Sequence, residues 1–149
     1  MYSKNAVGVI DRDKRTMIAT WSIAEEGRRN APMAFDEADH RLFVVARDPG
    51  RVIVLDTDSG KIITSLPGGS MLSDDAFFDP ILKRLYVTGI PFLSVFQKHE
   101  GDSYQMLGQV PTAFHALQAI LVSQLSRYYL SVPHHGKVEA QVQVYETVP

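Results

Sequence analysis

The sequence predicts an all-β fold made of about three four-stranded antiparallel β-propeller blades, which amounts to half a propeller. Two observations predict it. Short runs of β-branched and aromatic residues alternate with turn residues along the chain. Similar strand sequences also recur 43 to 45 residues apart. A period in the forties with four short strands is typical of a propeller blade, whereas a β-sandwich would not need the same strand to recur in register.

The first unit, residues 1–24, is expected to supply only the last two strands of a blade. Its first run, Ala6–Asp11, resembles Arg51–Asp56. Its second run, Thr16–Trp21, resembles Lys61–Leu66. Both matches lie 45 residues later in the chain, so the repeat is expected to start partway through a blade.

The second unit, residues 30–67, is the clearest copy of the repeat. The loop Glu25–Asn30 leads into it, and the turns Arg47–Gly50 and Asp56–Lys61 divide its apolar runs. Proline presets one turn dihedral, glycine tolerates a positive φ, and Asp and Ser side chains bond the local backbone. Its strands are expected at Met33–Phe35, Leu42–Ala46, Val52–Leu55 and Ile62–Leu66.

The third unit, residues 73–111, repeats this order 43 residues later. Its first strand is expected within Asp75–Pro80, and its second is expected to begin at Arg84. Its third and fourth strands are expected at Phe92–Phe96 and Tyr104–Val110. The fourth unit, residues 115–149, is expected to be an incomplete terminal blade that lacks a fourth strand. Its strands are expected at Ala119–Val122, Tyr128–Val132 and Ala140–Tyr145.

Three arginines recur at one position of the repeat, namely Arg41, Arg84 and Arg127. Recurrence in successive units indicates a structural role, such as a salt bridge to Asp36 or Asp79, because a ligand site would more often use unequal residues. Trp21 closes a strand and is expected to pack between blades.

Composition excludes several classes of protein and site. Fifteen basic and seventeen acidic residues give a formal charge of −2, and no basic stripe for nucleic acid is visible. The absence of cysteine excludes disulfides, thiolate metal sites and cysteine nucleophiles. No apolar run could span a bilayer, and Met1–Asn5 lacks a signal-peptide pattern. The chain as written is therefore expected in the cytoplasm, with no membrane or nucleic-acid partner, although a longer parent could be periplasmic or extracellular.

A half ring raises the question of what covers its two ends. Propellers protect their sheet edges by closing the ring. One expectation is a homodimer in which the N-terminal strands of one chain complete the C-terminal blade of the other. The other expectation is that the chain is a fragment of a longer protein, and the sequence favours neither.

Four residues are expected near the mouth of the central channel, namely Asn30, Asp74, Asp75 and His115. Inner strands of a propeller start at the channel, so Asp74 and Asp75 could hold a hard cation through oxygen ligands. The favoured alternative is a capped turn, in which Ser73, Asp74 and Asp75 bond local backbone donors. The four residues are therefore no more than candidates for a ligand-binding site at the channel mouth, with no assigned metal ligand.

No catalytic residue is predicted. A serine nucleophile would need a histidine and an acid beside it, and no nucleophile-elbow motif occurs. The segment Pro67–Ser70 is a linker between blades and not a phosphate-binding loop. The adjacent His134 and His135 chelate one ion poorly, because neighbouring side chains in a strand point to opposite faces. Solvated loop histidines are the favoured interpretation, also for His115.

Three segments carry a resemblance to a known family. They are Tyr86–Gly89, the Phe-Asp to Arg-Leu-aromatic-Val pattern at Phe35–Val44 and Phe78–Val87, and the turn Val54–Lys61. In these segments the chain resembles the YVTN-type β-propeller repeat proteins, and in particular the C-terminal half of such a propeller. Leu121–Gln124 departs from the motif in the last unit. The resemblance implies a fold and no single function, because the family includes binding proteins and the wider superfamily includes enzymes.

The function expected from these features is a non-catalytic binding or scaffold module. It would recognise a protein or a small ligand through the loops on one face, because rigid scaffolds place function on loops. The alternative is a metal-assisted, lactonase-like hydrolase or a quinoprotein-like enzyme that acts at the central channel. No cofactor is predicted, and a divalent cation at the channel is left open.

Overall fold

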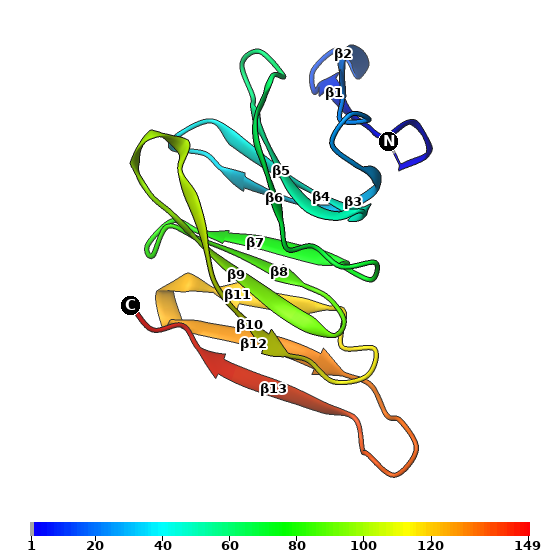
Figure 1. Ribbon diagram of the computed structural model, residues 1–149, viewed down its shortest axis with the longest axis vertical. Helices are drawn as coiled ribbons and strands as arrows, with labels where there is room; N and C mark the ends of the chain where they lie inside the picture. Colours follow the sequence, from blue (N-terminus) through cyan, green and yellow to red (C-terminus); the bar gives the residue numbers. More distant parts are fainter. Residues whose placement is uncertain (1) are drawn as a thin grey trace.

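The computed structural model describes residues 2–149 and consists of four antiparallel sheets joined in chain order (Figure 1). Met1, the first residue of the predicted first unit, lies outside the described residues. The strands are β1 (Ala6–Asp11), β2 (Thr16–Ser22), β3 (Arg28–Asp36), β4 (Arg41–Asp48), β5 (Gly50–Asp56), β6 (Ile62–Pro67), β7 (Asp75–Asp79), β8 (Arg84–Thr88), β9 (Phe92–Lys98), β10 (Tyr104–Pro111), β11 (Ala119–Val122), β12 (Arg127–Val132) and β13 (Gln141–Glu146). Three-residue 3-10 helices lie at Tyr2–Lys4, Glu100–Asp102 and Ser123–Leu125.

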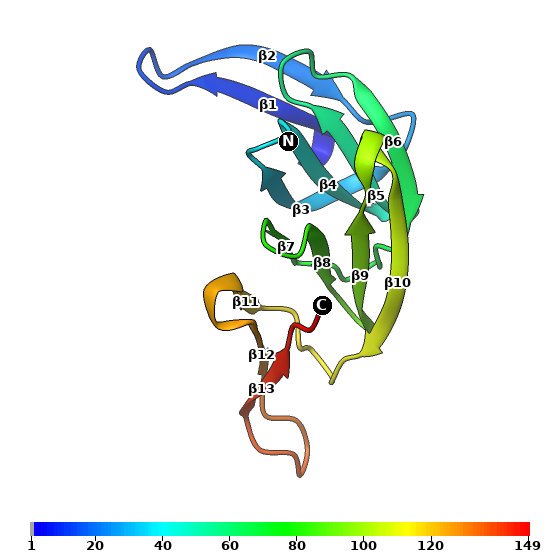
Figure 2. The same cartoon turned by 90° about the vertical axis from the view of Figure 1, so that its left-hand side faces the viewer.

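The four sheets have the strand counts that the repeat predicts. The first sheet is β1-β2, the second blade is β3-β4-β5-β6, the third blade is β7-β8-β9-β10 and the last sheet is β11-β12-β13. Figure 2 shows these sheets following one another in an arc, with β3, β7 and β11 on one side and β6 and β10 on the other. The architecture is therefore about half of a β-propeller. None of the helices described in residues 2–149 has the length needed to cross a membrane.

The second blade begins earlier than the sequence indicates. Arg28 and Asn30 belong to β3 and pair with Asp48 and Ala46 of β4, although Glu25–Asn30 was expected to be a loop. The pairing extends this far because β4 runs on to Asp48 and offers free backbone partners beyond its apolar core. The pairing between β3 and β4 changes register between Asn30 and Met33, as it does at a β-bulge.

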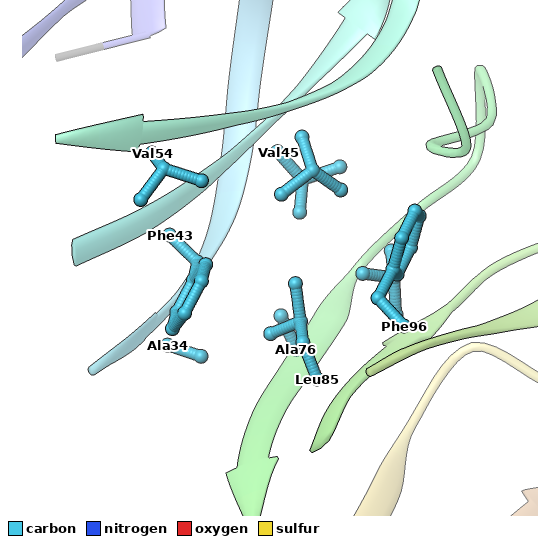
Figure 3. Close-up of a cluster of buried hydrophobic side chains, with 9 residues drawn as sticks. Ala34, Phe43, Val45, Val54, Ala76, Leu85 and Phe96 are labelled. Atoms are coloured by element: carbon cyan, nitrogen blue, oxygen red, sulfur yellow. The ribbon is translucent and has the colours of Figure 1, made fainter. Parts of the chain in front are cut away.

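The main core lies between the second and third blades (Figure 3). Side chains at alternate positions of facing sheets meet there, as the two-residue period of a strand requires. The ring of Phe43 stacks on Phe78 at 5.3 Å between centroids and meets Tyr104 edge-on at 5.6 Å. The other buried members are Ala34, Val45, Val52, Val54, Ala76, Leu85, Val87 and Phe96.

A second cluster joins the first sheet to the second blade and includes Val7, Ile23, Val44 and Ile53. Trp21 is half-buried against it, which confirms that this side chain packs between blades. Gly60 allows this packing, because a Cβ at that position would lie 2.2 Å from the indole ring. Its φ of 73° also belongs to the left-handed region that favours glycine.

The partners predicted for the recurring arginines are wrong. Arg41 does not bond Asp36, although the two residues are cross-strand neighbours. It bonds Asp102, because the carboxylate of Asp36 is occupied by a lysine of the next blade. Arg84 likewise does not bond Asp79, because Asp79 Oδ1 accepts hydrogen bonds from its own turn. Arg84 instead donates to the side-chain amide oxygen of Gln97 on β9.

Candidate binding surfaces

The two aspartates that were expected at the channel mouth, Asp74 and Asp75, make contacts between blades. Arg47 of the second blade forms an ion pair with Asp74 and donates from Nε to the Ser73 carbonyl at 2.9 Å. Asp75 accepts the backbone N–H of Ala119, in the last sheet, at 2.7 Å. Both carboxylates therefore have structural partners that tie neighbouring sheets together.

The other two residues that were expected at the channel mouth, Asn30 and His115, lie in different surroundings. Asn30 is buried, its Nδ2 lies 3.5 Å from the Ala6 carbonyl, and its Oδ1 has no hydrogen-bond partner among residues 2–149. His115 is exposed, and its ring lies 4.2 Å from that of Phe114, which also stacks on His135 at 3.8 Å. The two histidines thus contact one exposed aromatic ring.

Within residues 2–149, no hydrogen bond or ion pair joins the side chains of any two of these four residues. They come from the second blade, the linker and first strand of the third blade, and the linker before the last sheet. Within the described part of the chain, no group of three or more His, Cys, Asp or Glu side chains is arranged to hold a metal ion. The geometry therefore gives Asp74 and Asp75 a role in joining blades.

A cleft lined mainly by charged residues lies at the opposite end of the sheets. We call it the charged cleft, and its volume is about 570 Å³. It opens between the β3–β4 turn, the β7–β8 turn and the β9–β10 turn, whereas Asp75 stands at the other end of β7. Its lining residues are Asp39, Arg41, Lys83, Lys98, His99, Glu100, Gly101 and Asp102.

One part of the cleft floor is an arginine held by two carboxylates. Arg41 donates from Nε and Nη2 to the two oxygens of Asp102 at 2.8 and 2.9 Å, and from Nη1 to Asp56 at 2.8 Å. The hydrogen bonds from Arg41 lower the pKa of the Asp102 carboxyl. Such a bidentate pair between adjacent blades fixes the β9–β10 turn against the second blade.

The other part of the floor is a buried lysine. Lys98 forms ion pairs with Asp36 and Asp39, and the side chains of Lys98 and Asp36 are each only 5% exposed. Burial alone would lower the pKa of Lys98, but the hydrogen bonds to the two aspartates outweigh it and the net shift is upward. The hydrogen bond from Lys98 also lowers the pKa of Asp39.

The rim of the cleft has a different character from its floor. Lys83, His99 and Glu100 are exposed, and no ion pair among residues 2–149 engages their side chains. The rim therefore presents both signs of charge on a rigid base. The cleft could not be predicted from the sequence, because its ion pairs join residues 61 and 62 positions apart. A short sequence motif cannot indicate an ion pair between residues so far apart in the chain.

Large apolar side chains are exposed on the faces that open toward the two ends of the arc. On β3, Met33 and Phe35 are 51% and 50% exposed, where the first sheet lacks two inner strands. On the last sheet, Ile120, Val142 and Val144 are 62%, 63% and 55% exposed. Contiguous exposed apolar side chains of this kind mark surfaces of association.

Comparisons with known proteins identify the fold and no family. No protein-family model matches the chain, and no curated protein matches it. Among solved structures, hydrazine synthase of Kuenenia stuttgartiensis is similar over 97% of this chain and 41% of its own, with a TM-score of 0.81 and 13% identity.

Two further structures extend the likeness. A candidate 6-phosphogluconolactonase of Bacteroides uniformis matches 98% of this chain and 49% of its own, with a TM-score of 0.72 and 15% identity. The Swd1 β-propeller domain of Myceliophteria thermophila matches 97% and 46%, with a TM-score of 0.66 and 9% identity. The chain thus spans less than half the length of each of these three structures. At such identities the likeness concerns the fold alone, and the chain has the fold of a partial β-propeller.

Proposed function

We propose that this chain is a non-catalytic binding module whose partner, a protein or a small polar ligand, docks at the charged cleft. The observation that carries the proposal is the exposed rim of Lys83, His99 and Glu100 above a floor fixed by one buried and one half-buried ion pair. Such folds bind their partners through turns held on a rigid scaffold, and charged turns attract charged partners. Because the floor charges already have partners, a ligand would interact mainly with the rim.

The alternative, a metal-assisted or quinoprotein-like enzyme at the channel, has less support. It would need several side chains that converge on one point of the channel. Asp74 is bound by Arg47, and Asp75 accepts the N–H of Ala119. The likeness to the lactonase candidate, at 15% identity, supports only a shared fold.

Reversing one rim charge tests the binding proposal. Lys83→Glu is expected to weaken retention of the partner about fivefold, because a rim charge contributes to encounter and modestly to affinity. The matched control is Arg28→Glu, which reverses an exposed charge at the opposite end of the sheets. Proteins and metabolites retained by the wild-type chain and both variants would be compared by quantitative mass spectrometry. Equal retention by all three chains would contradict a partner site at the charged cleft.

We propose in addition that two copies associate through their end sheets to close a ring. The exposed apolar side chains at both ends support this, since burial of such surface drives association. The last sheet and the first sheet together hold five strands, one more than a complete blade. Packing of one sheet face on another therefore suits the two ends better than sharing of one four-stranded blade.

The oligomeric state tests this second proposal. Light scattering coupled to size exclusion is expected to give the mass of a dimer, and Ile120→Asp is expected to give a monomer, because a charge at the centre of an apolar contact must lose its hydration. Ile63→Asp is the control, since Ile63 is also exposed but lies on the outer strand of the second blade. A monomeric wild-type chain, or a dimer unaffected by Ile120→Asp, would contradict ring closure through these faces.

A further inference from the structure

The junction between the third blade and the last sheet repeats the backbone of the preceding junction. Lys98, at the end of β9, donates its backbone N–H to the Lys83 carbonyl at 2.9 Å. Thr147, just after β13, donates its backbone N–H to the Ser126 carbonyl at 3.0 Å. Lys83 and Ser126 are 43 residues apart, and each precedes the second strand of its sheet. Thr147 therefore occupies in the last sheet the position that Lys98 occupies in the third blade.

The carboxylates at the ends of β3 and β7 are equivalent as well. Asp36 ends β3 and is paired in register with Arg41, and Asp79 ends β7 and is paired in register with Arg84. Both aspartates are buried, at 4% and 1% exposure. The two junctions thus place a buried carboxylate at the same point of the repeat.

The charges at the two junctions differ. Lys98 reaches back to Asp36 and satisfies it, whereas the threonine side chain is three methylene groups shorter than lysine and carries no charge. Asp79 Oδ1 accepts the backbone N–H groups of its own turn, but Asp79 Oδ2 and Thr147 Oγ1 have no hydrogen-bond partner among residues 2–149. Thr147 is 7% exposed, so both unpaired oxygens are shielded from solvent.

The neighbouring side chains do not neutralise Asp79. Leu82 stands 43 residues after Asp39, so the second carboxylate of the preceding junction is replaced by an apolar group. Arg84 donates to Gln97 and to the Val148 carbonyl and makes no ion pair with Asp79. A buried carboxylate without a counter-charge is strongly unfavourable.

We propose that Asp79 Oδ2 and Thr147 Oγ1 bind a small monovalent cation, of the size of ammonium or potassium, which supplies the charge that Lys98 supplies at the preceding junction. A monovalent ion matches the single uncompensated charge, because Leu82 removes the second carboxylate that a divalent ion would require. Oxygen ligands are those that such cations prefer. This site is separate from the charged cleft and does not depend on the function proposed for it.

Thermal unfolding of the full chain tests the site directly. The melting temperature would be measured by calorimetry in choline chloride, with choline replaced stepwise by ammonium or potassium at constant ionic strength. Binding to the folded state alone is expected to raise Tm by about 3 °C when the cation exceeds its Kd about tenfold. Choline is too large to enter a buried site and serves as the reference ion. Identical melting temperatures in all three salts would overturn the proposal in favour of a bound water molecule or a protonated carboxyl.

Three variants separate this site from general effects of salt. Asp79→Asn keeps an acceptor for the turn but removes the charge, and is expected to abolish the increase in Tm. Asp36→Asn is the matched control, because Lys98 already serves that junction, and it is expected to keep the full increase while lowering Tm in every salt. Thr147→Lys is expected to raise Tm in choline chloride and to remove the response to ammonium and potassium. A full response in Asp79→Asn would place the cation elsewhere and overturn the proposal.

Discussion

Replacing Lys98 with alanine is expected to destabilise the protein by about 3–5 kcal/mol, because the change leaves the buried carboxylate of Asp36 without its cation. The side chains of both residues are 5% exposed, so solvent cannot replace the lost partner. The lysine stem also passes over Phe78, with Nζ 5.9 Å from the ring centroid. Equilibrium unfolding in urea would measure the loss, and Tm is expected to fall by about 10 °C.

A double substitution distinguishes the loss of a partner from the loss of packing. Lys98→Met with Asp36→Leu removes both charges and keeps similar volumes, and it is expected to recover most of the stability. Lys83→Ala is the control for loss of a positive charge at the surface, and it is expected to change stability by less than about 0.5 kcal/mol. A cost below about 1 kcal/mol for Lys98→Ala would show that the ion pair does not hold the two blades together.

Local chemistry explains why the strands were predictable and the site was not. The turn residues around Pro49 and Gly60 and the period of 43 residues place most strands within a residue or two. The start of β3 was not predictable, because Arg28 enters the sheet only through pairing with the far end of β4. The sequence repeat reflects the strands and turns within a single blade.

Contacts between blades do not appear in the repeat. Arg41 recurs as Arg84, yet the first bonds Asp102 in the next blade and the second bonds Gln97 in its own. Asp36 and Asp79 are equivalent in sequence, but Asp36 has a lysine as its partner and Asp79 Oδ2 has no hydrogen-bond partner among residues 2–149. Such differences are set by residues about sixty positions away, which no pattern within one repeat unit contains.

Replacing Phe43 with alanine is expected to cost about 3–5 kcal/mol in the free energy of unfolding, measured by urea denaturation. Its side chain is fully buried in the cluster between the second and third blades (Figure 3). Its ring also packs on those of Phe78 and Tyr104. Truncation removes both aromatic contacts and opens a cavity that rigid neighbouring strands can fill only in part. Loss of these contacts is also expected to weaken the packing of the third blade on the second.

Phe35 provides the matched control for this substitution. It lies on β3 and is paired in register with Leu42, the residue before Phe43, so it is on the opposite face of the sheet from Phe43, and it is 50% exposed. Phe35→Ala is therefore expected to cost less than about 1 kcal/mol, because little buried area is lost. Equal costs for the two substitutions would contradict a core located between the blades. A large difference would mean that the contact between neighbouring blades, rather than pairing within one blade, supplies the stability on which the charged cleft and the buried aspartates depend.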